Sequence, residues 1–155
     1  MTLVIIISVI LFIIDQISKI LIIKYIDINH SIELIKNFFY LTYTHNEGAA
    51  FSILTGQRIF LILIAITILV ILFNYIRKNK IKTKVESVAF SLIIGGSLGN
   101  LIDRIARGYV VDFLDFKIFG YNYPIFNLAD TFIVIGVFLL LIVTLTRKEV
   151  KHDNR

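Results

Sequence analysis

Residues 108–136 read GYVVDFLDFKIFGYNYPIFNLADTFIVIG and combine two kinds of structure in one segment. The first part is rich in aromatic and β-branched residues on both sides of a Gly-Tyr-Asn turn, which predicts short strands or a hairpin at a membrane interface. From about residue 125 a long apolar run follows, and Asp130 lies near its beginning. A carboxylate inside such a run costs about 2.5 kcal/mol or more by insertion scales. Asp130 is therefore a candidate functional residue.

The composition of the whole chain predicts a membrane protein. Of its 155 residues, 57% are hydrophobic and 17% are charged, and the mean hydropathy is +0.86. Soluble domains usually have about 45–50% apolar and about 25% charged residues. The chain lacks cysteine, which excludes disulfides, thiol catalysis and thiolate metal sites. No internal repeat or linker composition divides the sequence, so we expect one domain over residues 1–155.

Four apolar stretches are long enough to cross a bilayer as helices, which takes roughly 20 residues each. They cover approximately residues 3–23, 58–76, 85–102 and 125–146. The first lacks the basic start and the cleavage site of a removable signal peptide, and it is expected to be retained. We expect an all-α membrane fold with four transmembrane helices and a small β element.

Basic residues predict the orientation of these spans. Most of them lie in RKNKIKTK (77–84), between the second and third spans, and in RKEVKHDNR (147–155), after the fourth. The positive-inside rule makes both segments cytoplasmic. Both termini are then cytoplasmic, and the two outer loops form an extracytoplasmic β-rich platform that includes SIELIKNFFYLTYT (31–44). The formal charge of +5 is explained by topology and anionic lipid, and nucleic acid is not an expected partner.

Polar side chains from distant segments converge on the outer half of this predicted bundle. The first and third spans run outward and the fourth runs inward, and each residue advances about 1.5 Å along its helix. The converging residues are Asp15, Lys19, Asn46, Asn100, Arg104, Asp112, Asn127 and Asp130. Ionisable residues within spans usually face the bundle interior and mark functional sites. The sequence therefore predicts a polar site near the outer membrane surface.

The residue types available at this site favour carboxylate chemistry. The chain has no G-x-S-x-G turn and no H-E-x-x-H or similar spacing of metal ligands, which argues against a Ser-His hydrolase and a metallohydrolase. Two neighbouring aspartates cannot both ionise easily, so one can take a proton from water while the other polarises a carbonyl. Asp112 and Asp130 are the favoured pair because both lie where water and substrate can meet. Asp15 is deeper, and Lys19 is its neutralising partner.

Five stretches of the chain, taken together and in order, resemble the lipoprotein signal peptidases. They are DQISK (15–19), HNEGAAFS (45–52), GNLIDR (99–104), VVDF (110–113) and FNLAD (126–130). This family, also called signal peptidase II, consists of bacterial intramembrane aspartic proteases. The resemblance implies that Asp112 and Asp130 form the catalytic dyad. The supporting residues that it implies are Asp15, Lys19, Asn46, Asn100, Arg104 and Asn127.

The resemblance also implies a substrate and a location. Such enzymes remove signal peptides from prolipoproteins by cutting on the N-terminal side of a cysteine that carries a diacylglyceryl group, and they need no metal or organic cofactor. The expected protein is a multi-pass, monomeric enzyme of the bacterial cytoplasmic membrane that contacts membrane lipid. Its active site is expected to face the extracytoplasmic side.

Several of these residues also have purely structural interpretations. Asp112 and Asp130 could be surface aspartates, and Asp130 could cap a helix start, where negative charge is favoured. Asp15 and Lys19 are one helical turn apart and are better explained as a structural ion pair than as catalytic groups. Asn46 precedes Glu-Gly and could simply terminate a turn.

Other conspicuous residues receive structural assignments only. Gly95 and Gly99 have the small-xxx-small spacing of a helix dimer, although close packing within the bundle explains it better. His45 is expected to be an ordinary interfacial histidine. Asp103 and Asp115 are expected to be solvated loop charges.

Two other classes of protein fit parts of the pattern. A proton-coupled small membrane carrier would also have carboxylates in its spans, but carriers usually bind near the midplane through broken helices and internal repeats. A non-catalytic membrane scaffold would keep its activity when Asp112 is replaced by asparagine. Substrate flux in sealed vesicles and cleavage in detergent separate these alternatives from a protease.

Overall fold

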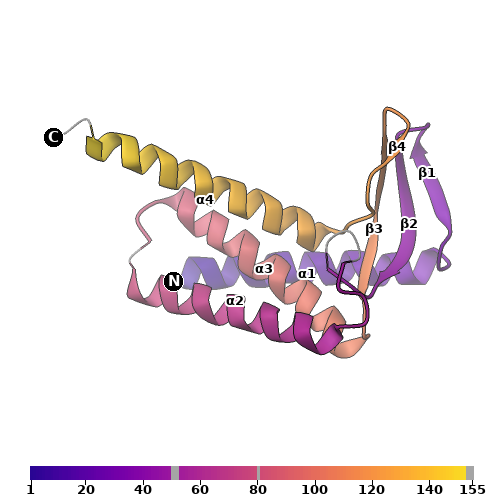
Figure 1. Ribbon diagram of the computed structural model, residues 1–155, viewed down its shortest axis with the longest axis horizontal. Helices are drawn as coiled ribbons and strands as arrows, with labels where there is room; N and C mark the ends of the chain where they lie inside the picture. The colour runs from indigo at the N-terminus through magenta and orange to yellow at the C-terminus, as the bar shows by residue number, and fades with distance from the viewer. Residues whose placement is uncertain (50–52, 80, 153–155) are drawn as a thin grey trace.

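The computed structural model describes residues 1–49, 53–79 and 81–152, with only the backbone described for 147–152. Within these residues, four helices are long and apolar enough to cross a membrane. They are α1 (Thr2–Tyr25), α2 (Arg58–Lys78), α3 (Lys84–Ala106) and α4 (Leu128–His152). Figure 1 shows these helices side by side, with a small sheet at one end of the bundle. The predicted architecture of four spans and a β element is confirmed.

Helix α3 lies at the centre of the bundle and packs against the other three helices. Its glycines allow this close packing. A side chain at Gly95 would collide with the backbone of Ser8 in α1, and one at Gly96 would collide with the backbone of Ala129 in α4. Gly99, the other member of the predicted small-residue spacing, lies against the side chain of Asp15 in α1. Both Gly95 and Gly99 therefore serve close packing within the bundle, as expected.

The two outer loops join into one antiparallel sheet in the order β1, β2, β3, β4. The strands are β1 (Ser31–Ile35), β2 (Phe39–Asn46), β3 (Val110–Ile118) and β4 (Tyr121–Asn122). The turn between β3 and β4 consists of Phe119 and Gly120, whereas the sequence suggested Gly-Tyr-Asn. Both residues have positive φ, 50° and 79°, which matches the twist that two-residue hairpin loops prefer.

Helix α4 begins later than the expected residue 125. Phe126 pairs with Leu114 of β3 as an isolated bridge, and the helix starts at Leu128. The apolar run is therefore divided: its first residues extend the sheet and the remainder enters the membrane. At the other boundary, α3 continues one turn beyond the expected residue 102 and ends at Ala106. This additional turn carries Asp103 and Arg104 on helix rather than on loop.

The sheet lies at the ends of α1, α3 and α4 (Figure 1). A small hydrophobic core joins the two parts, with Ile22 of α1 and Ile26 immediately after it packed against Tyr43, Val111 and Phe113 of the sheet. The first residue of the chain and the end of α4 lie at the opposite end of the bundle. Strand β3 packs against α1 and α3. It thereby brings Asp112 into contact with Asn127, immediately before α4.

Candidate active site

Asp130 is held in place by the start of its own helix. Asn127 precedes the helix, and its side-chain Oδ1 accepts a hydrogen bond of 3.0 Å from the Asp130 backbone N–H. In return, Oδ2 of Asp130 accepts a hydrogen bond of 3.3 Å from the backbone N–H of Asn127. This reciprocal arrangement is a capping box. The helix-capping interpretation of Asp130 does not exclude a functional role, because the capping hydrogen bonds orient its carboxylate.

Asp112 approaches from β3 and is almost fully buried, with 2% of its surface exposed. Each of its carboxylate oxygens accepts one amide hydrogen bond, 2.7 Å from Asn127 and 2.8 Å from Asn46. Burial is the larger and the negative charge of Asp130 the smaller of two causes that raise the pKa of Asp112 from its ordinary value of 3.8 to about 7. Near neutral pH this carboxyl can therefore carry a proton.

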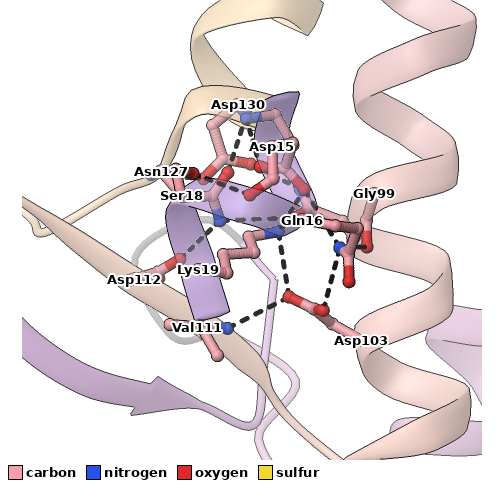
Figure 2. Close-up of polar contacts among 12 residues, drawn as sticks. Asp15, Gln16, Ser18, Lys19, Gly99, Asp103, Val111, Asp112, Asn127 and Asp130 are labelled. Carbon is pink, nitrogen blue, oxygen red and sulfur yellow. Dashed lines mark hydrogen bonds and ion pairs between the residues drawn. The ribbon is translucent and has the colours of Figure 1, made fainter. Parts of the chain in front are cut away.

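Two asparagine side chains connect the aspartates, and Figure 2 shows one of them, Asn127, together with Asp112 and Asp130. Besides its bond to Asp112, the Nδ2 of Asn127 lies 3.2 Å from the Oδ1 of Asn100. The Nδ2 of Asn100 in turn donates a hydrogen bond of 2.7 Å to Asp130. Both amides are buried, with Asn127 completely so. The result is a continuous hydrogen-bond chain from Asp112 on β3 through Asn127 and through Asn100 on α3 to Asp130 on α4.

A buried ionic cluster lies beside this chain. Lys19 is completely buried, and its Nζ lies 2.9 Å from Asp15, 2.9 Å from Asp103 and 3.1 Å from the Oδ1 of Asn100. The predicted pair of Asp15 and Lys19 is therefore present. The expectation that Asp103 is a solvated loop charge is wrong, because α3 extends past it and turns its carboxylate toward Lys19. Asp103 also pairs with Arg107.

Sequence reasoning missed Asp103, Arg107 and Gln16 as members of this site. Gln16 donates hydrogen bonds to Asp15 and Asp103 and accepts one from Arg107. A signal for two of them was present, because Asn100, Asp103 and Arg107 follow a spacing of i, i+3 and i+7 that places them on one helical face. Ending the span at residue 102 concealed that pattern.

Arg104 connects the bundle to the loop after β2. Its Nη2 donates a hydrogen bond of 2.8 Å to the carbonyl of Gly48. Asn46 folds the same loop, since its Oδ1 accepts a bond from the Gly48 N–H while its Nδ2 contacts Asp112. Its turn-forming and site-related roles therefore coexist. Within the described residues, the Nε of Arg104 is a buried donor without an acceptor.

A cavity of about 470 Å³ opens beside the two aspartates. Its polar lining residues are Asp112, Asp130, Asn46, Asn100 and Arg104. The rest of the lining is mostly apolar and includes residues 123–126 before α4 and 133–135 on α4. The cavity lining therefore combines a pair of carboxylates with apolar side chains.

The remaining candidates have structural partners outside the cavity. His45 stacks on Tyr109 with ring centroids 3.5 Å apart, and its Nε2 lies 2.8 Å from the Tyr43 hydroxyl. Burial lowers the pKa of His45. Asp115 lies on β3 and accepts a hydrogen bond of 2.7 Å from Thr42, so it is a strand residue rather than a loop charge. The eight residues predicted to converge do lie together: seven come from α1, α3, α4, β2 and β3, and Asn127 immediately precedes α4.

The fold is a bundle of four helices long and apolar enough to span a membrane, with two aspartates linked through two asparagines at one end. It defines a multi-pass membrane protein with a carboxylate site. Residues 7–146 match the family described as Signal peptidase (SPase) II. The chain belongs to this family.

Two relatives and one solved structure show how far the similarity extends. The lipoprotein signal peptidase of Haemophilus ducreyi is 44% identical over 150 residues, covering 94% of this chain and 92% of the relative. That of Staphylococcus aureus is 43% identical over 150 residues, covering 97% and 92%. A solved bacterial membrane enzyme structure has a TM-score of 0.89 and 42% identity, covering 96% of this chain and 90% of the other.

Proposed function

We propose that this protein is an intramembrane aspartic endopeptidase that removes signal peptides from diacylglyceryl-modified prolipoproteins. The cut falls on the N-terminal side of the lipid-bearing cysteine. The observation that carries the proposal is the pair of Asp112 and Asp130, which come from β3 and α4, are joined through Asn127 and Asn100, and line one cavity. Membership of the signal peptidase II family supports the same activity.

The surroundings of the two carboxylates suggest different roles for them. Asp112 is nearly fully buried and has a pKa raised to about 7, so it carries the shared proton. Asp130 is only half-buried and sits in the first turn of α4, where the helix dipole favours negative charge. It also receives the amide of Asn100. Asp130 is therefore the ionised member that acts as general base.

The reaction follows from these two states. Asp130 takes a proton from a water molecule, and the water oxygen attacks the scissile carbonyl carbon. Asp112 donates its proton to the carbonyl oxygen, which gives a neutral tetrahedral intermediate. In the second step the proton on Asp130 passes to the leaving amide nitrogen and the C–N bond breaks. Asp112 recovers a proton from the intermediate as the new carboxyl group forms, and the starting state is restored.

The cavity supports a substrate that is part peptide and part lipid. Arg104 is a lining residue of the cavity, and its buried Nε–H has no acceptor among the described residues. An unpaired buried donor is costly, and a substrate carbonyl would satisfy it. The apolar residues 123–126 and 133–135 offer a surface for acyl chains. A lipid-modified peptide in the membrane would thus reach the aspartates laterally.

The orientation in the membrane belongs to the same proposal. Arg77 and Lys78 end α2 at the opposite end from the sheet, and the positive-inside rule assigns that end to the cytoplasm. Both termini are then cytoplasmic, and the aspartates face the extracytoplasmic side of a bacterial cytoplasmic membrane. We further propose that the chain acts as a single domain and as a monomer.

The test is cleavage of a purified diacylglyceryl-modified precursor in detergent. Wild type is expected to cut the precursor. Asp112→Asn and Asp130→Asn are expected to be inert, although thermal unfolding measurements should show that both variants are folded. Asp27→Asn, at an exposed position on the loop after α1, is the matched control and should cut normally. Cleavage by either dyad variant at the wild-type rate would contradict the proposal. Transport of a solute by vesicles containing the protein, without cleavage, would favour the carrier, and activity that survives Asp112→Asn would favour the scaffold.

A further inference from the structure

The ionic cluster around Lys19 contacts the backbone on both sides of the site. Asp15 accepts a hydrogen bond of 3.0 Å from the backbone N–H of Ala129. Asp103 accepts one of 3.3 Å from the backbone N–H of Val111. Ala129 immediately precedes Asp130 and Val111 immediately precedes Asp112. Each carboxylate that pairs with Lys19 therefore also holds the residue next to one of the two aspartates.

Lys19 joins these two anchors directly and is the only cation that does so among the described residues; the neutral amide of Gln16 also donates to both carboxylates. Asp15 belongs to α1 and Asp103 to α3, and both lie 2.9 Å from the Nζ of Lys19. Figure 2 shows Lys19 between Asp103 and the start of α4, with the dashed line from Asp103 continuing to Val111. The backbone at the start of α4 and the backbone of β3 are thus both linked, through Asp15 and Asp103, to one buried ammonium group.

The third hydrogen bond of Lys19 points in the same direction. It goes to the Oδ1 of Asn100, so the oxygen of that amide faces Lys19 and its NH₂ group faces Asp130. An ammonium group can only donate, and it therefore selects this amide orientation over the flipped one. Lys19 controls both the backbone beside Asp130 and the donor that the carboxylate receives.

The cluster is difficult to explain as a source of stability. Asp15, Lys19 and Asp103 are all completely buried, and the desolvation of buried ion pairs usually offsets their attraction. With Arg107 included, the cluster contains two carboxylates and two cations, so its charges balance. Buried ionic groups of this kind are better justified by the geometry they impose.

We propose that Asp15, Lys19 and Asp103, here called the Lys19 clamp, fix the separation and relative orientation of Asp112 and Asp130. Lys19 is a positioning residue: it touches neither the proposed dyad nor the substrate cavity and acts through the two backbone anchors and Asn100. The proposal rests on the proposed function for the roles of the two aspartates. It adds that the cooperation of Asp112 on β3 and Asp130 on α4 depends on a cation that belongs to α1.

The clamp predicts a defect in turnover rather than in substrate binding. Displacement of catalytic groups by about 1 Å can reduce rates about 100-fold. Lys19→Met should therefore lower kcat about 100-fold while KM stays within about twofold, and Lys24→Met, at an exposed position one turn after it on α1, should match wild type. The pH profile of kcat/KM should change as well, because carboxylates that are farther apart interact less. The acidic and basic limbs of this profile should move toward each other.

The charged groups that face the dyad from other elements are Lys19 on α1 and Arg104 on α3. Arg104 is unchanged in every variant, so its effect on the limbs is constant. Loss of the Lys19 charge alone would shift both limbs toward higher pH, since a nearby cation favours ionised carboxylates. Limbs that shift in parallel would therefore overturn the clamp, whereas limbs that converge support it.

Hydrogen–deuterium exchange gives a readout that does not require activity. Peptides covering residues 108–114 and 126–132 report on the N–H groups of Val111 and Ala129. Lys19→Met should accelerate exchange in both peptides together. Asp103→Asn should act mainly on the first peptide and Asp15→Asn mainly on the second, because each of these variants disturbs one anchor.

The outcomes separate the clamp from the proposed function. If wild type cuts the precursor but folded Lys19→Met keeps its kcat and both limb positions, the clamp is overturned and the peptidase assignment stands. If wild type does not cut, the peptidase assignment fails and the exchange pattern alone decides the clamp. If Lys19→Met does not fold, the two single-anchor variants decide: segment-specific acceleration supports the clamp, and equal acceleration of both peptides or none contradicts it.

Discussion

The burial of Asp112 predicts that replacing it will inactivate the protein and also make its stability less sensitive to pH. In the folded state the pKa of Asp112 is about 7, whereas its ordinary value is 3.8. Between these values the folded protein binds a proton that the unfolded chain has released. The contribution of Asp112 to stability is therefore greatest below about pH 4 and falls as the pH rises to about 7. Asp112→Asn removes this titrating group and should remove the associated loss of stability.

The size of the effect follows from the two pKa values. One pKa unit corresponds to about 1.4 kcal/mol, so a carboxyl with a pKa of about 7 rather than 3.8 destabilises the fully ionised folded state by about 4 kcal/mol. Part of this penalty is already present at pH 5. Raising the pH from 5 to 8 should therefore change the stability of Asp112→Asn relative to wild type by about 2 to 3 kcal/mol.

The substitution also has a cost that does not depend on pH. Asn46 and Asn127 both donate to Asp112, and the introduced amide would place an NH₂ group opposite one of these donors. Leaving a buried donor unpaired costs about 1 to 3 kcal/mol. The informative quantity is therefore the change with pH and not the difference at a single pH.

Thermal unfolding in detergent at pH 5 and pH 8 measures this change. For a domain of about 150 residues, each kcal/mol moves Tm by about 2 to 4 °C. The Tm of Asp112→Asn relative to wild type should rise by about 5 to 10 °C between the two pH values. A difference that is the same at pH 5 and pH 8 would refute the assignment of a raised pKa to Asp112, and with it the role of this residue as the protonated partner.

Three further predictions follow from the site. For wild type, kcat/KM should decline above about pH 7, because Asp112 then loses its proton; a rate that is constant to pH 9 would contradict this. Gly99→Ala should reduce cleavage and alter the pH profile because the new methyl group would collide with the carboxylate of Asp15, whereas Gly95→Ala, one turn away on the same face of α3, should reduce Tm without altering the profile. Arg104→Lys should raise KM at nearly constant Tm, since Lys cannot replace the forked guanidinium; an unchanged KM would count against a role in substrate binding.

Much of this arrangement could be predicted from the sequence because it depends on spacing along single elements. Apolar runs of membrane length specify the four helices, and aromatic, β-branched stretches with turn residues specify the strands. The spacing of Asp15 and Lys19 specifies their ion pair. The sequence Asn127-Leu-Ala-Asp130 contains the separation of a capping box, although only the start of α4 at Leu128 made that separation meaningful.

The rest could not be predicted because it depends on how elements meet. Asp103 looks like a loop charge until α3 extends to Ala106 and packs against α1, which turns the side chain toward Lys19. The union of the two outer loops into one sheet places Val111 above Asp103, and no local pattern encodes that pairing. The sequence by itself determined which polar residues are present and how far along each apolar run they lie, because helix rise and hydropathy are local properties. Only the tertiary structure decided which of them share a hydrogen bond, because partner choice is fixed by the packing of α1, α3, α4 and β3 around one another.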